Sequence, residues 1–305
     1  MDRMKKLSCA LLCALFVLSF AGCGAKKTEA DGVDLREKLA SLVVTDEALG
    51  LAGKYSALSD IRDGSVDPAL VGTWVTADGE YAYTYEESGT ASVASPSYGD
   101  TQIQFTCLTV NGYSLICEEM IVSPEMNDGV TEETTQLAYT AYSVEEDVLY
   151  EVNVEEVSPD FTSSQSALIT LYRADENGST AKSMANNPIA LRTLDGTWTT
   201  EKGEITIENG TLTTGSESYS ISFNETNRLV VERDGQSTAY SMAITHMKDY
   251  DYEDRTQFTE KTVLGLYFTG ADENDKPNLL SLLDDWKTEY DWDSWYYSGS
   301  FELQK

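Results

Sequence analysis

The side chains that most often act as nucleophiles and bases are sparse in this chain. It contains a single histidine, His246, and no Gly-x-Ser-x-Gly motif. A catalytic serine or cysteine needs a base beside it, and with one histidine the chain has few candidates for that base. A metal site built from several histidines is excluded. His246 with Met242 and Met247 could bind a soft metal such as copper, but an exposed or hydrogen-bonded histidine explains the same residues.

Acidic side chains are the other possible source of chemistry. They cluster in the segments 249–254, 272–275 and 291–293. None of these segments has the calcium-loop spacing with a glycine at its sixth position, so solvated acidic loops are the simpler interpretation. A pair of carboxylates could serve a glycosidase-like hydrolase, but acids are so abundant that any pair can be chosen. We therefore expect no catalytic residues, no metal site and no cofactor, with a hydrolase as the weakest alternative.

Aromatic residues gather near the C-terminus, between residues 286 and 297. Trp286, Trp292 and Trp295 stand there beside several tyrosines and aspartates. Stacking surfaces next to hydrogen-bond acceptors suit polyhydroxyl ligands, whereas a helix packed on a strand would use the same residues as core. Ligand contact by these three tryptophans is therefore a hypothesis.

Composition and charge restrict the class of protein. The chain has 305 residues, 41% hydrophobic and 24% charged, which is typical of a soluble globular protein long enough for two domains of modest size. Lys and Arg number 21 against 52 Asp and Glu, a net charge of −31. Because such a surface repels phosphates, nucleic acid is excluded as a partner. The same field favours cationic partners.

The first 23 residues read as an export signal. Three basic residues in positions 1–6 precede an apolar stretch at 7–21. This stretch is short for a bilayer span of about 20 residues but suits a signal peptide. It ends in Phe20-Ala21-Gly22-Cys23, which resembles the bacterial lipobox, with Phe20 where leucine is usual.

The lipobox resemblance implies cleavage of a signal peptide at 1–22 and acyl chains, such as palmitate, on Cys23. Two or more acyl chains hold a protein stably on a membrane. The protein would then be a lipoprotein, extracytoplasmic and anchored to the cell membrane, on a tether within 23–65. An ordinary secretory signal cut near Ala21 is the alternative, with Cys23 incidental.

Cys107 and Cys117 flank the turn sequence Asn111-Gly112, and export would permit a disulfide between them. A two-residue turn would place them on opposite faces of the hairpin, where they cannot bridge. A three-residue loop would place them directly opposite each other. We expect the disulfide, although Asn-Gly favours the shorter turn.

Two segments have helical periodicity. Leu35, Leu39 and Leu42 follow a spacing of three to four residues in the segment 33–58, with Asp34 able to cap the helix. Near the C-terminus, an apolar stripe from Leu279 to Trp286 predicts a second helix.

From about residue 66 the pattern becomes that of antiparallel strands. Turn signals such as Asn-Gly and Asp-Gly recur, and apolar residues alternate with polar ones, as in 148–154. Strands at this spacing with no helices between them predict a sandwich or barrel.

The chain also repeats itself. Leu70–Thr76 is similar to Leu194–Thr200, and each copy contains Gly-Thr-Trp. We therefore expect two related β-domains, at 66–185 and 188–305, joined near residues 186–188.

Gly-x-Trp at the start of a first strand resembles the lipocalin signature. The resemblance implies two lipocalin-like antiparallel β-barrels or sandwiches of the kind found in bacterial surface lipoproteins. It also implies a basic residue over each tryptophan: Arg173 over Trp74, and Arg233 or Lys305 over Trp198.

Fold resemblance alone does not give function. We expect a non-catalytic binding module on the cell surface, with an unknown ligand or protein partner. A structural or envelope-maintenance lipoprotein without a small-molecule site is the alternative. An apolar cavity inside a barrel would favour binding, and a filled interior would favour the structural role.

Overall fold

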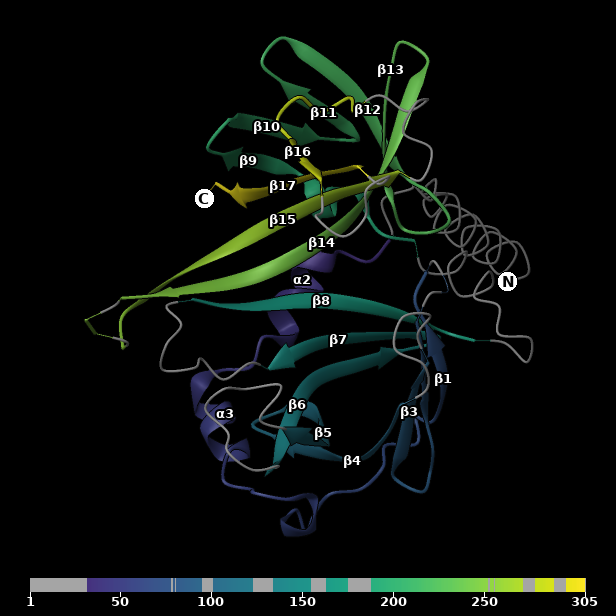
Figure 1. Cartoon of the computed structure of the whole chain (residues 1–305), viewed down its shortest axis with the longest axis vertical. Helices are drawn as coiled ribbons and strands as arrows, with labels where there is room; N and C mark the ends of the chain where they lie inside the picture. The colour runs from purple at the N-terminus through teal and green to yellow at the C-terminus, as the bar shows by residue number, and fades with distance from the viewer. Residues whose placement is uncertain are drawn as a thin grey trace, which may run out of the picture.

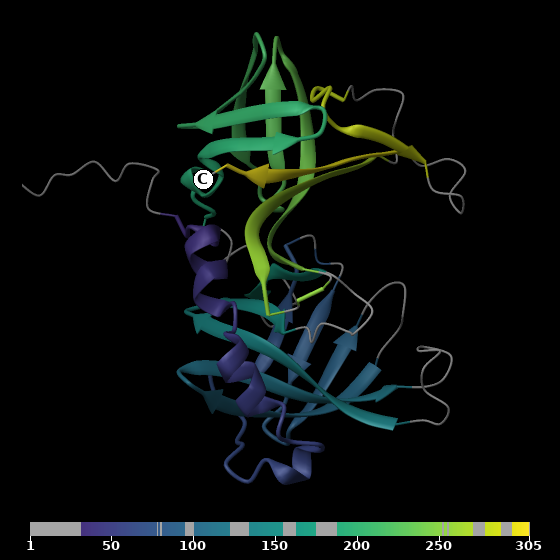
Figure 2. The ribbon, with the colours of Figure 1, turned by 90° about the vertical axis from the view of Figure 1, so that its left-hand side faces the viewer.

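In a computed structural model of the chain, the structure describes residues 32–77, 79, 81–94, 101–122, 134–154, 163–174, 188–251, 253–254, 256–270, 278–287 and 295–304. The fold is mainly β and contains two α-helices within these residues (Figures 1 and 2). No helix in the described part of the chain is both long and apolar enough to cross a membrane.

The first eight strands form a closed antiparallel barrel. Each strand pairs with the next, and β8 returns to pair with β1. The strands are β1 (Gly72–Val75), β2 (Ala82–Tyr85), β3 (Thr90–Ala94), β4 (Thr101–Val110), β5 (Tyr113–Val122), β6 (Thr134–Glu145), β7 (Val148–Val154) and β8 (Ser163–Arg173). We call this barrel the first ring.

A second closed ring of antiparallel pairings follows. It runs from β9 to β15, passes to β17 and closes where the end of β17 pairs with β9, while the short strand β16 pairs with the beginning of β17. The strands are β9 (Gly196–Thr200), β10 (Gly203–Glu208), β11 (Thr211–Thr214), β12 (Glu217–Phe223), β13 (Leu229–Arg233), β14 (Gln236–Tyr250), β15 (Phe258–Gly270), β16 (Asp284–Lys287) and β17 (Trp295–Leu303).

The tight turns follow from their sequences. At Asn111-Gly112, Asn209-Gly210 and Asp234-Gly235, both central residues have positive φ. This is the type I′ turn, whose twist matches that of the flanking strands, and Asn-Gly and Asp-Gly adopt it at low cost.

The two rings are not separate bodies, because strand pairing continues from one to the other. β8 pairs with β14 from Ala167↔Thr245 to Ser163↔Asp249. Figure 1 shows the long strands β14 and β15 leaving the second ring together, with β14 lying along β8. We call this β8–β14 pairing the seam. A division into two independent domains stays a prediction.

Two helices pack against the rings on one side of the seam (Figure 2). Helix α2 (Leu35–Leu42) begins at Asp34, whose side chain accepts from the backbone N–H of Arg36 at 3.0 Å. Leu35, Leu39 and Leu42 are buried, as their spacing predicts. Helix α3 (Asp46–Ala52) begins at Thr45. Short 3-10 turns, η1 (Leu58–Asp60) and η2 (Leu191–Leu194), complete the helical segments that the structure describes.

The helix predicted near the C-terminus is wrong. Leu280 to Leu283 form one turn, closed by a 3.0 Å bond from Leu283 N to Leu280 O, and β16 starts at the next residue. Both leucines are buried in the core. Apolar residues three positions apart occur both in a single turn and in a longer helix. The spacing therefore predicted correctly that these leucines are buried, but it did not predict that the turn ends after four residues.

Candidate functional site

The first Gly-x-Trp motif stabilises the entry to the first ring. Trp74 is fully buried, and its Nε1 donates to the Leu70 carbonyl at 2.7 Å. The Arg173 guanidinium lies 4.1 Å from the centre of the tryptophan ring and donates to the Val71 carbonyl. Gly72 has φ +133°, and a Cβ there would lie 2.6 Å from Arg173 Nη1. Glycine therefore lets the arginine approach the backbone.

The second motif has the same geometry with an unexpected partner. Trp198 is fully buried, and its Nε1 donates to the Leu194 carbonyl at 2.7 Å. The cation near this motif is Arg36 of α2, whose Nη1 donates to the Asp195 carbonyl at 2.8 Å. Asp195 occupies the same place in the repeat as Val71, so Arg36 takes the backbone contact that Arg173 makes in the first ring.

Of the two predicted partners of Trp198, Arg233 does not take this place. Arg233 forms an ion pair with Glu217 at 2.6 Å and lies over the ring of Tyr219, and Lys305 is outside the described residues. Sequence reasoning missed Arg36 because it precedes the motif by some 160 residues and lies on a helix. Its position shows that the N-terminal segment is part of the fold around the second ring.

The interior of the first ring is filled by large side chains. Trp74, Tyr85, Phe105, Ile116 and Leu149 pack together there and are each at most 5% exposed. The places that a lipocalin ligand would occupy are taken by these residues. A ligand site inside this ring is therefore not supported.

Two carboxyl groups nevertheless face that interior. Glu151 on β7 is 5% exposed and accepts from the Tyr85 hydroxyl at 3.1 Å, and Glu118 on β5 is partly buried opposite Phe105. Burial raises the pKa of each to about 7, and the charge of Glu118 adds to the shift of Glu151. Near neutral pH both groups titrate.

The predicted disulfide between Cys107 and Cys117 is wrong, because both thiols are free. The turn takes two residues, so Val110 pairs with Tyr113 and Cys107 pairs with Ile116. Cys107 therefore packs toward the interior of the first ring, while Cys117 belongs to the core beneath the helices. Burial raises the pKa of Cys117 to about 12, so this thiol stays protonated.

The copper-type cluster around His246 does not assemble. Alternation along β14 puts Met247 on the opposite face of the strand from His246. His246 lines a cavity of about 270 Å³ with Lys248 and Tyr250, whereas Met247 lines a different one. Burial lowers the pKa of His246. Within the described residues, no group of three or more His, Cys, Asp or Glu side chains could hold a metal ion.

The other predicted sites lie wholly or partly outside the described structure. Cys23 and Trp292 are outside the described residues. Trp286 lies on β16 and Trp295 on β17, where Trp295 pairs with Lys287, but the structure describes only the backbone of these two tryptophans.

An open groove of about 470 Å³ lies along the seam. Its residues come from both rings and are mostly hydroxyl, amide and charged side chains. We call it the seam groove, and its lining residues are Gln165, Thr199, Thr200, Glu201, Thr245, Met247, Lys261, Val263, Gly265, Tyr267, Ser300 and Glu302.

An aromatic ring lies in the seam groove. Tyr267 is 45% exposed. Among the described residues, Phe258 is the other large hydrophobic residue with high exposure, at 39%. A Cβ at Gly265 would lie 2.7 Å from the Tyr267 hydroxyl and 3.1 Å from Cζ, so the tyrosine ring covers this glycine. Aromatic cover of a strand glycine stabilises a sheet, and here it also leaves part of the ring open to solvent.

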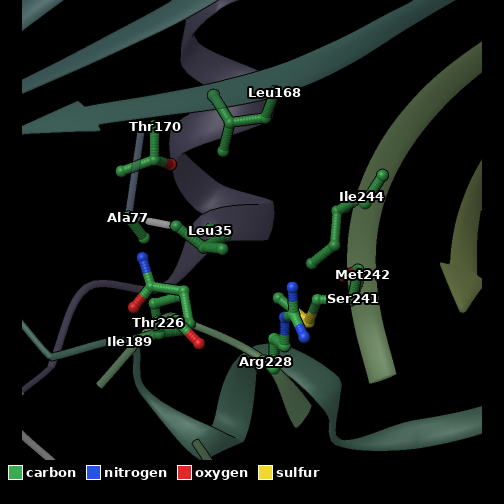
Figure 3. Close-up of a pocket in the computed structure, with 12 residues that line it drawn as sticks. Leu35, Ala77, Leu168, Thr170, Ile189, Thr226, Arg228, Ser241, Met242 and Ile244 are labelled. Carbon is green, nitrogen blue, oxygen red and sulfur yellow. The ribbon is translucent and has the colours of Figure 1, made fainter. Parts of the chain in front are cut away.

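A smaller cavity, of about 170 Å³, lies between the rings on the side of α2 (Figure 3). We call it the inter-ring cavity. Its lining residues are Leu35, Ala77, Leu168, Thr170, Ile189, Thr226, Asn227, Arg228, Ser241, Met242, Ala243 and Ile244.

Comparison with known proteins found no matching family model, no matching curated protein and no matching solved structure.

Proposed function

We propose that this protein is a lipid-anchored extracytoplasmic lipoprotein that binds its ligand without catalysis. The Phe20-Ala21-Gly22-Cys23 sequence after a basic and apolar N-terminus supports the anchor at Cys23. Replacement of Cys23 by alanine is expected to release the protein from the membrane fraction of the producing cell. A Cys23→Ala protein that still sediments wholly with membranes contradicts the anchor.

In this proposal the two rings are related lipocalin-like domains. The support is the repeated Gly-x-Trp, in which each tryptophan donates to the carbonyl four residues before it at 2.7 Å. Each motif also has an arginine on the carbonyl that precedes its glycine. Ligand-binding lipocalins have an open cavity inside the barrel, whereas the interior of the first ring is filled by side chains. In this proposal the ligand therefore binds outside the rings.

The observation that carries the proposal is the seam groove with Tyr267 in it. A partly exposed aromatic face bordered by Thr245, Ser300 and Gln165 offers stacking and hydrogen bonding together. These are the contacts that a sugar ring uses, since its C–H face stacks on an aromatic ring and its hydroxyls bond to polar neighbours. A net charge of −31 disfavours anionic polymers, so the ligand class proposed is a neutral glycan.

Calorimetric titration of neutral glucose hexasaccharides, α-1,4-linked and β-1,4-linked, tests this site. Wild-type protein is expected to bind one of them saturably, and Tyr267→Ala to lose that binding. Phe258→Ala is the matched control, because Phe258 is also an exposed aromatic residue of β15 and lies outside the seam groove.

A second variant separates the ring position from the chemistry of tyrosine. Gly265→Ala keeps the tyrosine at position 267 but puts a methyl group against its hydroxyl end, so the ring has to move. This variant is expected to weaken binding while the melting temperature stays close to that of wild type. Binding by Tyr267→Ala at wild-type affinity, or no saturable binding by wild type, contradicts the glycan proposal.

A structural role in the envelope is the second candidate function. The filled interior of the first ring and the continuous pairing across the seam favour it. In that case no oligosaccharide would bind, while loss of the protein would alter the envelope itself.

A further inference from the structure

The inter-ring cavity has an unusual balance of charge for this chain. Arg228 is the charged residue among the twelve that line it, and none is acidic. With 52 acids in 305 residues, twelve positions would carry about two acids on average. The site is therefore a positive spot in a strongly negative protein.

The turn that carries Arg228 is held firmly in place. Asn224 Oδ1 accepts from the Arg228 backbone N–H at 2.9 Å, and Asn227 has positive φ. The Asn227 side chain donates to the hydroxyl of Tyr172, a fully buried residue of the first ring. This bond fixes a turn of the second ring against the first.

The Arg228 side chain points into the cavity, and within the described part of the chain no acidic residue forms an ion pair with it. Figure 3 shows its guanidinium beside Met242, facing the space bounded by Leu35, Leu168 and Ile244. Arg228 is half-buried, and its side chain makes no ion pair or hydrogen bond with any residue that the structure describes. A partly desolvated guanidinium without an acceptor is a ready partner for a carboxylate, which it can bind through two parallel hydrogen bonds.

We propose that the inter-ring cavity binds a small apolar monocarboxylate, with its carboxylate on Arg228 and its hydrocarbon part against Leu35, Leu168 and Ile244. A cavity of about 170 Å³ is similar in size to engineered cavities of roughly 150 Å³ that hold benzene, so the ligand is of the size of benzoate or a short branched-chain acid. Multiply charged anions are disfavoured because the whole chain carries −31.

This site is independent of the seam groove. Met242 and Ile244 line the inter-ring cavity, whereas Thr245 and Met247 line the groove on the other face of β14. The whole ligand would contact both rings and α2. Its binding would therefore stabilise the contacts between these elements and raise the melting temperature by mass action.

Calorimetric titration of the folded protein with benzoate, isovalerate and benzamide tests the proposal. Benzamide matches benzoate in shape and lacks its charge. Wild type is expected to bind benzoate or isovalerate saturably, with a Kd of about 10 μM to 1 mM, as expected for roughly seven to nine heavy atoms. Benzamide is expected to bind at least about 10-fold more weakly.

The variants separate charge from shape. Arg228→Met is expected to weaken carboxylate binding at least about 10-fold, and Arg228→Lys to weaken it less, because lysine keeps the charge and loses the fork. Ala77→Leu places bulk in the cavity and is expected to abolish binding with Arg228 intact. Arg62→Met is the matched control, since Arg62 is exposed and lies outside the cavity.

Circular dichroism and the melting temperature establish that each variant folds, and Arg228→Lys and Ala77→Leu serve if Arg228→Met does not. No saturable binding of either carboxylate by wild type overturns the proposal. Equal binding of benzamide and benzoate overturns it as well, as does an unchanged affinity in the folded Arg228 and Ala77 variants.

Discussion

Replacing Glu151 with glutamine is expected to stabilise the protein at pH 8 and to change its stability by less than about 1 kcal/mol at pH 5. Glu151 lies inside the first ring at 5% exposure, and its pKa is raised from 4.5 to about 7, mainly by burial. The folded state therefore binds a proton more tightly than the unfolded state does. Stability from this group is fully present below pH 4.5 and is lost as the pH rises through 7.

The size of the effect follows from the size of the shift. A difference of roughly 2.5 pH units corresponds to roughly 3 kcal/mol in the free energy of unfolding. Glutamine keeps the shape and can still accept from the Tyr85 hydroxyl, but it never carries the charge. The advantage of Glu151→Gln over wild type should grow from less than about 1 kcal/mol at pH 5 to roughly 1–3 kcal/mol at pH 8.

Urea unfolding at several pH values from 5 to 8 measures this difference, and subtraction cancels the titration of the acids that are not coupled to Glu151. Glu232→Gln is the control: Glu232 is exposed on β13, so this change should stay within about 0.5 kcal/mol at every pH. A difference between Glu151→Gln and wild type that does not vary with pH would refute the reasoning, as would a variant less stable than wild type at pH 8.

Three further predictions concern the motifs and the thiols. Trp74→Ala and Trp198→Ala should each lower the free energy of unfolding by about 3–5 kcal/mol in urea titrations, and a loss below 1 kcal/mol at either site would contradict its role in the core. Arg36→Met should lower it by about 1–2 kcal/mol because the Asp195 carbonyl loses a charged donor, and a neutral change would mean that the cation is dispensable. Protein unfolded without reductant should be labelled at both Cys107 and Cys117 by a thiol reagent, whereas a mass two daltons lower with no labelling would indicate the disulfide.

The sequence predicted those parts of the fold that depend on local patterns. The Asn-Gly and Asp-Gly turns adopt positive φ, and the alternating segment 148–154 forms β7. The spacing of Leu35, Leu39 and Leu42 correctly predicted α2. In each case the deciding interaction lies within a few residues, so a single sequence contains it.

The errors came from features that a local pattern leaves undecided. One residue more or less in the turn at Asn111-Gly112 moves Cys107 to the other face of the hairpin relative to Cys117. The disulfide was predicted because the exported chain would have two cysteines close together. The preference of Asn-Gly for a two-residue turn was the better guide. The C-terminal stripe similarly fits one turn as well as it fits a helix.

The candidate sites depend on long-range pairing, which left no signal in the sequence. Ala167 meets Thr245 across the seam, and Arg36 meets Asp195, at separations of some 80 and 160 residues. Arg228 and Tyr267 are candidate ligand contacts because they line cavities that form between strands distant in the sequence. Neither residue belongs to a motif.

Two methionines on opposite faces of β14 allow a direct test of where ligands bind. Met247 lines the seam groove and Met242 lines the inter-ring cavity. Their ¹³C-methyl resonances, assigned through Met247→Leu and Met242→Leu, can be followed while a neutral hexasaccharide is titrated into the protein. We predict a saturable shift of the Met247 methyl with the Met242 methyl unmoved; saturable binding that leaves Met247 unmoved, or no shift of any methyl, would contradict a glycan site in the seam groove.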